Sequence, residues 1–184
     1  MKCSSWCKGV ILSFIFLMLM LSPLSAAQQE MADAPLGKTF DIIIIQKMDV
    51  PPNLAADYPD AANECETSAL EALKAKNIFQ RVEMGASKSK YDGAVLMIQP
   101  TLTSLRIVSG AARFWGGALA GNSDMSVTLK LVDASTGNVL REKSLSTANN
   151  PYAAAWTFGS SDKSMPSDMG KMIAEYVSAV SRTQ

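Results

Sequence analysis

Residues 110–121 read Gly-Ala-Ala-Arg-Phe-Trp-Gly-Gly-Ala-Leu-Ala-Gly, and residues 126–137 read Ser-Val-Thr-Leu-Lys-Leu-Val-Asp-Ala-Ser-Thr-Gly. The first stretch is rich in glycine, which predicts a turn. In the second, apolar residues at 127, 129 and 131 alternate with polar ones, as expected of a strand with one buried face. Asp133, Thr136 and Gly137 then mark a tight structural turn, because aspartate bonds its own turn backbone and glycine accepts a left-handed conformation. With a partner strand over residues 139–146, this part of the chain predicts a β-hairpin.

The remaining elements predict a sheet with two helices. Residues 40–45 (Phe-Asp-Ile-Ile-Ile-Ile) lack alternation, which is typical of a central strand covered on both faces. A short strand is expected within residues 78–83, and a long one over residues 94–108, with a bulge or an edge at Pro100 because proline lacks a backbone donor. One helix is predicted over residues 60–76, and a closing helix carries the apolar stripe Met169, Met172, Ile173, Tyr176, Val177 and Val180. The predicted fold is a single α+β domain of β-α-β-β-β-β-α order, with a mixed or mostly antiparallel sheet and two helices packed on it.

The first 27 residues have the order of a secretory signal peptide. Two lysines precede an apolar run over residues 10–21, and Ser22-Pro-Leu-Ser-Ala-Ala27 follows. We expect cleavage after Ala27, because small residues occupy the positions that a signal peptidase requires. An uncleaved anchor is the alternative, although the apolar run is shorter than the roughly 20 residues that span a bilayer. A lipid anchor is disfavoured because Gln28, and not a cysteine, follows the run.

These features divide the chain into a cleaved signal peptide (1–27), a flexible leader (28–38) and one domain (39–184) of a periplasmic or secreted protein. Cleavage removes two of the 17 basic residues and none of the 17 acidic ones, which leaves a net charge of about −2. That balance argues against nucleic acid as a partner, and we expect no membrane span after the signal. Cys65 becomes the only thiol; it lies on the apolar face of the predicted helix and is expected to be buried, with an intermolecular disulfide as the alternative.

The sequence offers no recognisable catalytic or cofactor-binding pattern. The chain contains no histidine, which excludes Ser-His-Asp and Cys-His catalysis and imidazole metal ligands. The acidic residues at 57, 60, 64 and 66 do not follow a calcium-loop pattern. The glycines of residues 110–121 lack the partners of a phosphate-binding loop. We therefore predict no catalytic, metal or cofactor residues and no enzyme activity.

The glycine-rich turn is instead a candidate interaction surface, comprising Arg113, Phe114, Trp115, Gly116, Gly117 and Gly121. Phe114 and Trp115 form an exposed aromatic knob for a protein or membrane partner, or one of the two folds back over the sheet edge. Arg113 either holds the turn or pairs with a carboxylate or lipid phosphate. The sequence leaves both alternatives open.

The arginine, the spaced glycines, the following strand and the Asp-x-x-Thr-Gly turn together resemble the signature of the bacterial domain of unknown function 4410 (DUF4410). The resemblance covers most of the chain after the signal peptide. It implies a secreted or lipid-anchored envelope protein of Gram-negative bacteria with no assigned activity. Because the lipidated cysteine is missing here, the resemblance implies a soluble periplasmic form.

Three functions follow as hypotheses. The first is a non-catalytic accessory domain that binds an unknown protein or envelope component through residues 107–122. The second is a self-assembling envelope component, in which the same turn or the strand 94–108 pairs with another copy. The third is a histidine-independent hydrolase, which needs paired carboxylates brought together by the fold.

Overall fold

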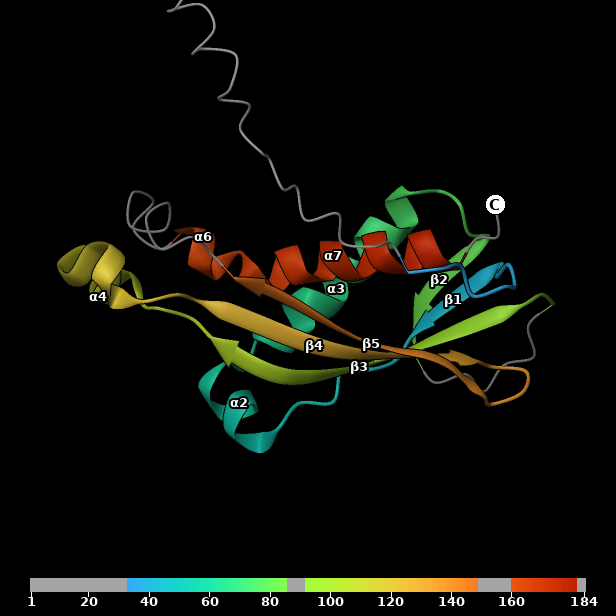
Figure 1. The fold of residues 1–184 in the computed structure, drawn as a ribbon, viewed down its shortest axis with the longest axis horizontal. Coiled ribbons are helices and arrows are strands. Elements are labelled where there is room, and N and C mark those ends of the chain that lie inside the picture. The colour runs from blue at the N-terminus through green and yellow to red at the C-terminus, as the bar shows by residue number, and fades with distance from the viewer. Residues whose placement is uncertain (1–32, 86–91, 149–159, 182–184) are drawn as a thin grey trace, which may run out of the picture. The chain divides into compact units, whose positions relative to one another are not determined.

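A mixed five-stranded sheet organises the computed structural model, which describes residues 33–85, 92–148 and 160–181. The strands are β1 (Ile42–Ile45), β2 (Arg81–Met84), β3 (Val95–Arg106), β4 (Asp124–Asp133) and β5 (Val139–Ala148), in the spatial order β2-β1-β3-β4-β5. The helices are α2 (Pro52–Asp57), α3 (Ala61–Ala75), α4 (Gly110–Gly116), α6 (Ser160–Lys163) and α7 (Met165–Val180), with a 3₁₀ helix η2 (Gly117–Ala120) after α4. The predicted α+β class and the mixed sheet are confirmed (Figure 1).

The sheet combines a parallel half and an antiparallel half. β1 pairs in parallel with both β2 and β3, whereas β3, β4 and β5 form an antiparallel meander. All four isoleucines of β1 are buried. Ile43 and Ile45 belong to the main core, and Ile42 and Ile44 form a smaller apolar cluster with Val95. The run of isoleucines without alternation therefore reflects a strand covered on both faces, as predicted.

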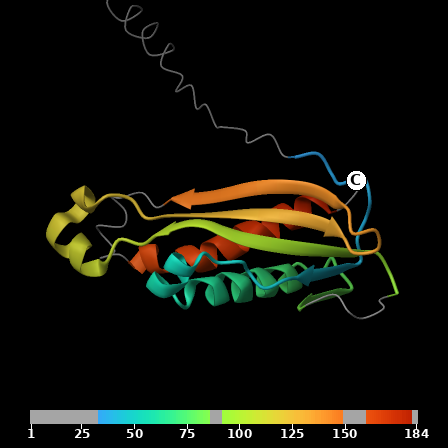
Figure 2. The ribbon, with the colours of Figure 1, turned by 90° about the horizontal axis from the view of Figure 1, so that it is seen from below.

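Helices α3 and α7 lie side by side over one face of the sheet (Figures 1 and 2). Cys65 is fully buried on the inner face of α3 and forms no disulfide, so the expectation that it acts as a small hydrophobe is confirmed. Gly170 of α7 lies directly against this part of α3. A Cβ at Gly170 would collide with the carbonyl oxygen of Cys65 and would lie 2.7 Å from the Cβ of Ser68. The two helices can approach this closely only because residue 170 has no side chain.

The irregularity of β3 occurs at Thr103 and not at Pro100. Pro100 pairs with Leu129 without a register shift, and its carbonyl oxygen accepts a 2.9 Å bond from the N–H of Asp49. The backbone nitrogen of Pro100 points to the same side of β3 as this carbonyl oxygen. On that side β1 has already ended at Ile45, so the N–H that proline lacks is not needed for the pairing of β1 with β3. The register shifts instead between Leu102 and Ser104. The extra residue, Thr103, allows both Leu102 and Leu105 to reach the core.

This pairing also corrects one version of the self-assembly hypothesis. Through Leu102, β3 has the chain of β1 and residue 49 on one side and β4 on the other. A central strand has no free backbone edge to offer a second copy. Pairing of another molecule along most of residues 94–108 is therefore excluded.

Residues 33–38, expected to form part of a flexible leader, are held against the domain. Asp33 accepts a 3.0 Å bond from the hydroxyl of Tyr176 and forms a 3.0 Å ion pair with Lys143. The N–H of Leu36 donates to the carbonyl of Val180 at 2.8 Å. These partners lie more than a hundred residues away in sequence, so local composition could not reveal them. The part of the chain that contacts the domain therefore begins at residue 33, six residues before the domain boundary expected at residue 39.

Candidate functional site

The connection between β3 and β4 carries the exposed apolar side chains of the candidate surface. It contains α4 and η2, whereas the sequence predicted only a turn. The hydroxyl of Ser109 accepts a 3.2 Å bond from the N–H of Ala112, which satisfies one free donor of the first helical turn. Gly117 then adopts a positive φ of 53°, which ends α4. We call residues 110–121 the apolar tip; Figure 2 shows α4 at one end of the sheet, beyond the strands.

Three large apolar side chains of the tip face solvent. Phe114 is 63% exposed, Trp115 is 85% exposed and Leu119 is 95% exposed. The rings of Phe114 and Trp115 meet edge to face, with centroids 5.1 Å apart. The two aromatic residues therefore form an exposed pair, and neither of them folds back over the sheet edge. Leu119 was missing from the sequence-based set, because a single leucine among glycines and alanines gives no periodic signal.

The base of the tip is fixed to the domain. Ser123 is fully buried, and its hydroxyl accepts a 2.9 Å bond from the N–H of Val108 across the connection. The N–H of Ile107 donates to the phenolic oxygen of Tyr58, the residue that ends α2, at 3.2 Å. The connection is thus hydrogen-bonded to the domain at Ile107 and closed across Val108 and Ser123. The tip begins only beyond them.

The charge of the tip is entirely basic. Arg113 is the only ionisable residue between positions 107 and 123. Its backbone belongs to α4, but its side chain lies outside the part of the structure that is described, so its two sequence-based roles stay predictions. Arg106, at the end of β3, is exposed, and a Cβ at Gly121 would lie 3.3 Å from its guanidinium. Gly121 itself has a φ of 92° and leads the chain back toward β4.

The turn at residues 133–137 has a structural role. Asp133 accepts bonds from the N–H and the hydroxyl of Ser135, at 2.9 and 2.6 Å. Gly137 has a φ of 74°, and its N–H donates to the carbonyl of Asp133. Thr136 accepts a 3.2 Å bond from the N–H of Asn138. The hydrogen bond from Lys38, 2.7 Å long, and those from Ser135 lower the pKa of the buried Asp133 to about 2.

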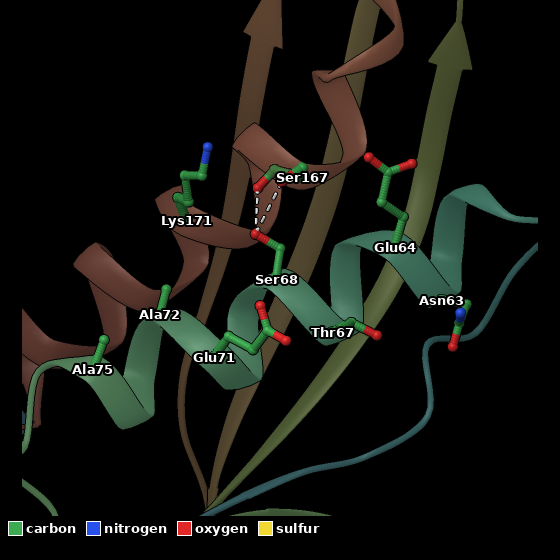
Figure 3. A pocket seen from close by; sticks show the side chains of 9 residues that line it. All are labelled: Asn63, Glu64, Thr67, Ser68, Glu71, Ala72, Ala75, Ser167 and Lys171. Carbon is green, nitrogen blue, oxygen red and sulfur yellow. Dashed lines mark hydrogen bonds between the residues drawn. The ribbon is translucent and has the colours of Figure 1, made fainter.

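A shallow groove of about 600 Å³ lies on the outer side of α3 and α7 and is lined mainly by polar side chains (Figure 3). Its central Ser68 donates a 2.7 Å bond to the backbone carbonyl of Ser167, so no basic group accepts the proton of this hydroxyl. Glu64 and Glu71 lie about 10 Å apart along the helix axis, because seven residues at 1.5 Å each separate them. Lys171 pairs with Asp168 at 2.9 Å.

A second hollow, of about 510 Å³, lies at the ends of β1 and β2 and includes Gln46, Lys47 and Glu66. The carboxylate of Glu66 accepts a hydrogen bond from the N–H of Met48 and so connects α3 to the chain that follows β1. In the portions of the chain that the structure covers, no three acidic or cysteine side chains gather closely enough to hold a metal ion. The same portions contain no helix with the length and apolar character needed to cross a bilayer.

Comparisons with known proteins place the chain in a family and a fold. The profile of a family described as Domain of unknown function (DUF4410) matches residues 24–180. No curated protein matches the sequence. The PelC dodecamer from Paraburkholderia phytofirmans is 16% identical, with a TM-score of 0.53, and the match covers 83% of this chain and 95% of that one. A Xanthomonas campestris protein of the DUF330 family is 10% identical, with a TM-score of 0.49 and coverage of 79% and 88%. The likeness to PelC shows a shared fold.

Proposed function

Because the chain belongs to the DUF4410 family, whose function is unknown, we propose a function from the site itself. The protein is a non-catalytic accessory domain of the bacterial envelope that binds another envelope component through its apolar tip. The observation that carries the proposal is the exposure of Phe114, Trp115 and Leu119 on a base that is buried and hydrogen-bonded. The signal-peptide pattern of residues 1–27 supports export to the periplasm or beyond.

The energetics of the tip favour binding over a role in folding. Large apolar side chains gain roughly 1.5–3 kcal/mol each when they leave water, and these three gain little of it within the domain. Clustered exposed apolar residues mark interaction sites, and aromatic residues are the commonest energetic anchors in them. The edge-to-face contact of Phe114 and Trp115 favours one arrangement of the two rings by roughly 0.5–1.5 kcal/mol, which lowers the entropy lost on binding.

The absence of enzyme activity is part of the proposal. The chain has no histidine, and the hydroxyl of Ser68, in the groove along α3 and α7, donates to a backbone carbonyl and not to a catalytic base. A histidine-independent hydrolase therefore has little support. A hydrolytic activity that disappears with Glu64→Gln or Glu71→Gln would revive it.

Crosslinking in intact envelopes tests the interaction role. Wild type, Trp115→Ala and Leu140→Ala are exported at equal levels, crosslinked and analysed by mass spectrometry. Leu140 is the matched control because it is an apolar residue with 37% exposure that lies on β5 and is not part of the tip. We expect the crosslinked species to be lost with Trp115→Ala and kept with Leu140→Ala. Equal crosslinking of all three proteins would contradict the assignment.

Self-assembly is a second candidate, and the fold shared with PelC, which is a dodecamer, favours it. The tip or the outer edge of β5, the last strand of the described sheet, would then contact another copy. Light scattering over a rising concentration series, with and without lipid, measures the mass directly. A mass that stays at one chain throughout removes this candidate.

A further inference from the structure

The geometry points to a specific partner for the apolar tip: the surface of a phospholipid bilayer with anionic headgroups. This inference rests on the proposed role of the tip as a binding surface and adds the chemistry of what it binds. Phe114, Trp115 and Leu119 would enter the boundary between headgroups and acyl chains, while the sheet and its helices stay in water.

The composition of the tip favours lipid over protein. Among residues 110–121, Arg113 is the only one with a polar side chain, and all the others are glycine, alanine, leucine, phenylalanine or tryptophan. Protein interfaces surround their apolar centre with a polar rim that makes hydrogen bonds. With Arg113 as its only polar side chain, the tip itself supplies little of such a rim. Tryptophan and phenylalanine beside small residues are instead typical of segments that lie in the membrane interface.

Charge complementarity selects the type of lipid. Between positions 107 and 123 the only charge is that of Arg113, and the exposed Arg106 lies just below, at the end of β3. Asp124, the cross-strand partner of Arg106, is half-buried and accepts a 3.4 Å bond from Ser104, so Arg113 carries the net positive charge of the tip. Basic residues next to an apolar insertion are attracted to anionic headgroups. The tip therefore combines apolar insertion with a local positive charge, although the chain as a whole is not basic.

The polar borders of the tip indicate how deeply it enters. Ser109 and Asn122 are both exposed and flank the tip on its two sides. The tip between them contains a seven-residue helix and a four-residue 3₁₀ helix, far too short to cross a bilayer. A shallow insertion of roughly 5–10 Å fits such a segment. The buried bond between Val108 and Ser123 holds the tip in position for this contact.

Vesicle binding tests the inference with Trp115 as its own reporter. Of the three tryptophans, Trp6 precedes the expected cleavage site, so Trp156→Phe leaves Trp115 as the only one in the exported protein. The purified exported protein is mixed with vesicles of phosphatidylcholine alone or with added phosphatidylglycerol. We expect flotation with the anionic vesicles, weaker flotation with the neutral ones, and a shift of Trp115 emission to shorter wavelength.

Paired variants identify the binding surface. Phe114→Ser with Trp115→Ser should weaken flotation by about tenfold or more, because two large apolar side chains no longer leave water. Val139→Ser with Leu140→Ser is the matched control, because it removes two exposed apolar side chains at the start of β5 instead, and it should leave flotation unchanged. Circular dichroism checks that both variants fold.

Two results would overturn the inference. One is wild-type protein that neither floats nor shifts its emission with anionic vesicles. The other is equal flotation of the tip variant and the wild type. If vesicles are not bound but Trp115→Ala still removes a crosslinked protein from envelopes, the tip binds protein, and only the lipid inference fails. If Trp115→Ala also leaves crosslinking in envelopes unchanged, both the lipid inference and the proposed function fail.

Discussion

The backbone N–H of Val108 donates a 2.9 Å hydrogen bond to the side-chain oxygen of Ser123, and both residues are buried. Val108 follows β3 and Ser123 precedes β4, so this bond closes the base of the apolar tip. At this end of the domain the buried polar groups of Val108 and Ser123 are hydrogen-bonded to each other. The exposed residues of the tip take no part in this bond. The residues that close this end of the domain therefore differ from the exposed residues of the tip.

Ser123→Ala should destabilise the domain. The substitution leaves the buried N–H of Val108 without its acceptor, which costs about 1–3 kcal/mol. Urea denaturation measures the free energy of unfolding. Ser146→Ala on the exposed side of β5 is the control, and it should change that free energy by no more than about 0.5 kcal/mol. Equal effects of the two substitutions would show that the bond contributes nothing.

Gly170→Ala should be among the most damaging single substitutions. The added methyl group overlaps the backbone of α3 at Cys65 and Ala69, and backbone atoms cannot rotate away. We expect a loss of about 3 kcal/mol or more, or no soluble protein at all. Lys171→Ala, one residue further on the exposed side of α7, should be nearly neutral. Thermal unfolding of the two variants compares them, and a stable Gly170→Ala protein would contradict the helix contact.

The free energy of unfolding should depend on pH through the carboxyl group of Asp133. Its pKa falls from the ordinary value of 3.8 to about 2 because Lys38 and Ser135 donate hydrogen bonds to its charged form. A lowered pKa means that the stabilisation is fully present above about pH 4 and is lost as the pH falls through about 2. Asp133→Asn should therefore be less stable than wild type at pH 7, with the difference vanishing in that window. Chemical denaturation at a series of pH values tests this. A difference that persists unchanged at pH 2 would refute the assignment.

Cys65 should resist thiol reagents in the folded protein. Burial, with the nearby carboxylates of Glu66 and Glu64 as smaller causes, raises the pKa of its thiol to about 12, so little thiolate exists at pH 8. We expect no labelling of the native exported protein by an aromatic disulfide reagent and full labelling in denaturant. A Ser146→Cys variant supplies an exposed thiol as the positive control. Rapid native labelling of Cys65 would mean that α3 and α7 separate readily.

The sequence predicts the structure well where neighbouring residues share one environment. Four consecutive isoleucines identify a central strand, and the spacing of Cys65, Ala69 and Leu73 identifies the inner face of α3. Asp133 and Gly137 locate the hairpin turn because their chemistry acts over only a few residues. Such patterns depend on local periodicity or on turn geometry.

The remaining features depend on contacts between distant residues. The position of the register shift in β3, at Pro100 or at Thr103, depends on where β1 ends. The sequence of β3 alone contains no information on that point. The glycines suggested a turn at residues 110–121, yet Ser109 and the alanines support a short helix there. The exposure of Leu119 follows from the position of the strand ends, so it could be seen only in the structure.

The docking of residues 33–38 has a practical consequence for recombinant work. A chain that is truncated to begin at residue 39 would lose Asp33, Leu36 and Lys38. Lys143, Tyr176 and Asp133 would then each lose a bonding partner, and the end of α7 would lose an apolar neighbour. Poor expression of such a fragment would reflect a missing part of the fold and not a defect of the whole domain. Expression boundaries should therefore lie upstream of residue 33.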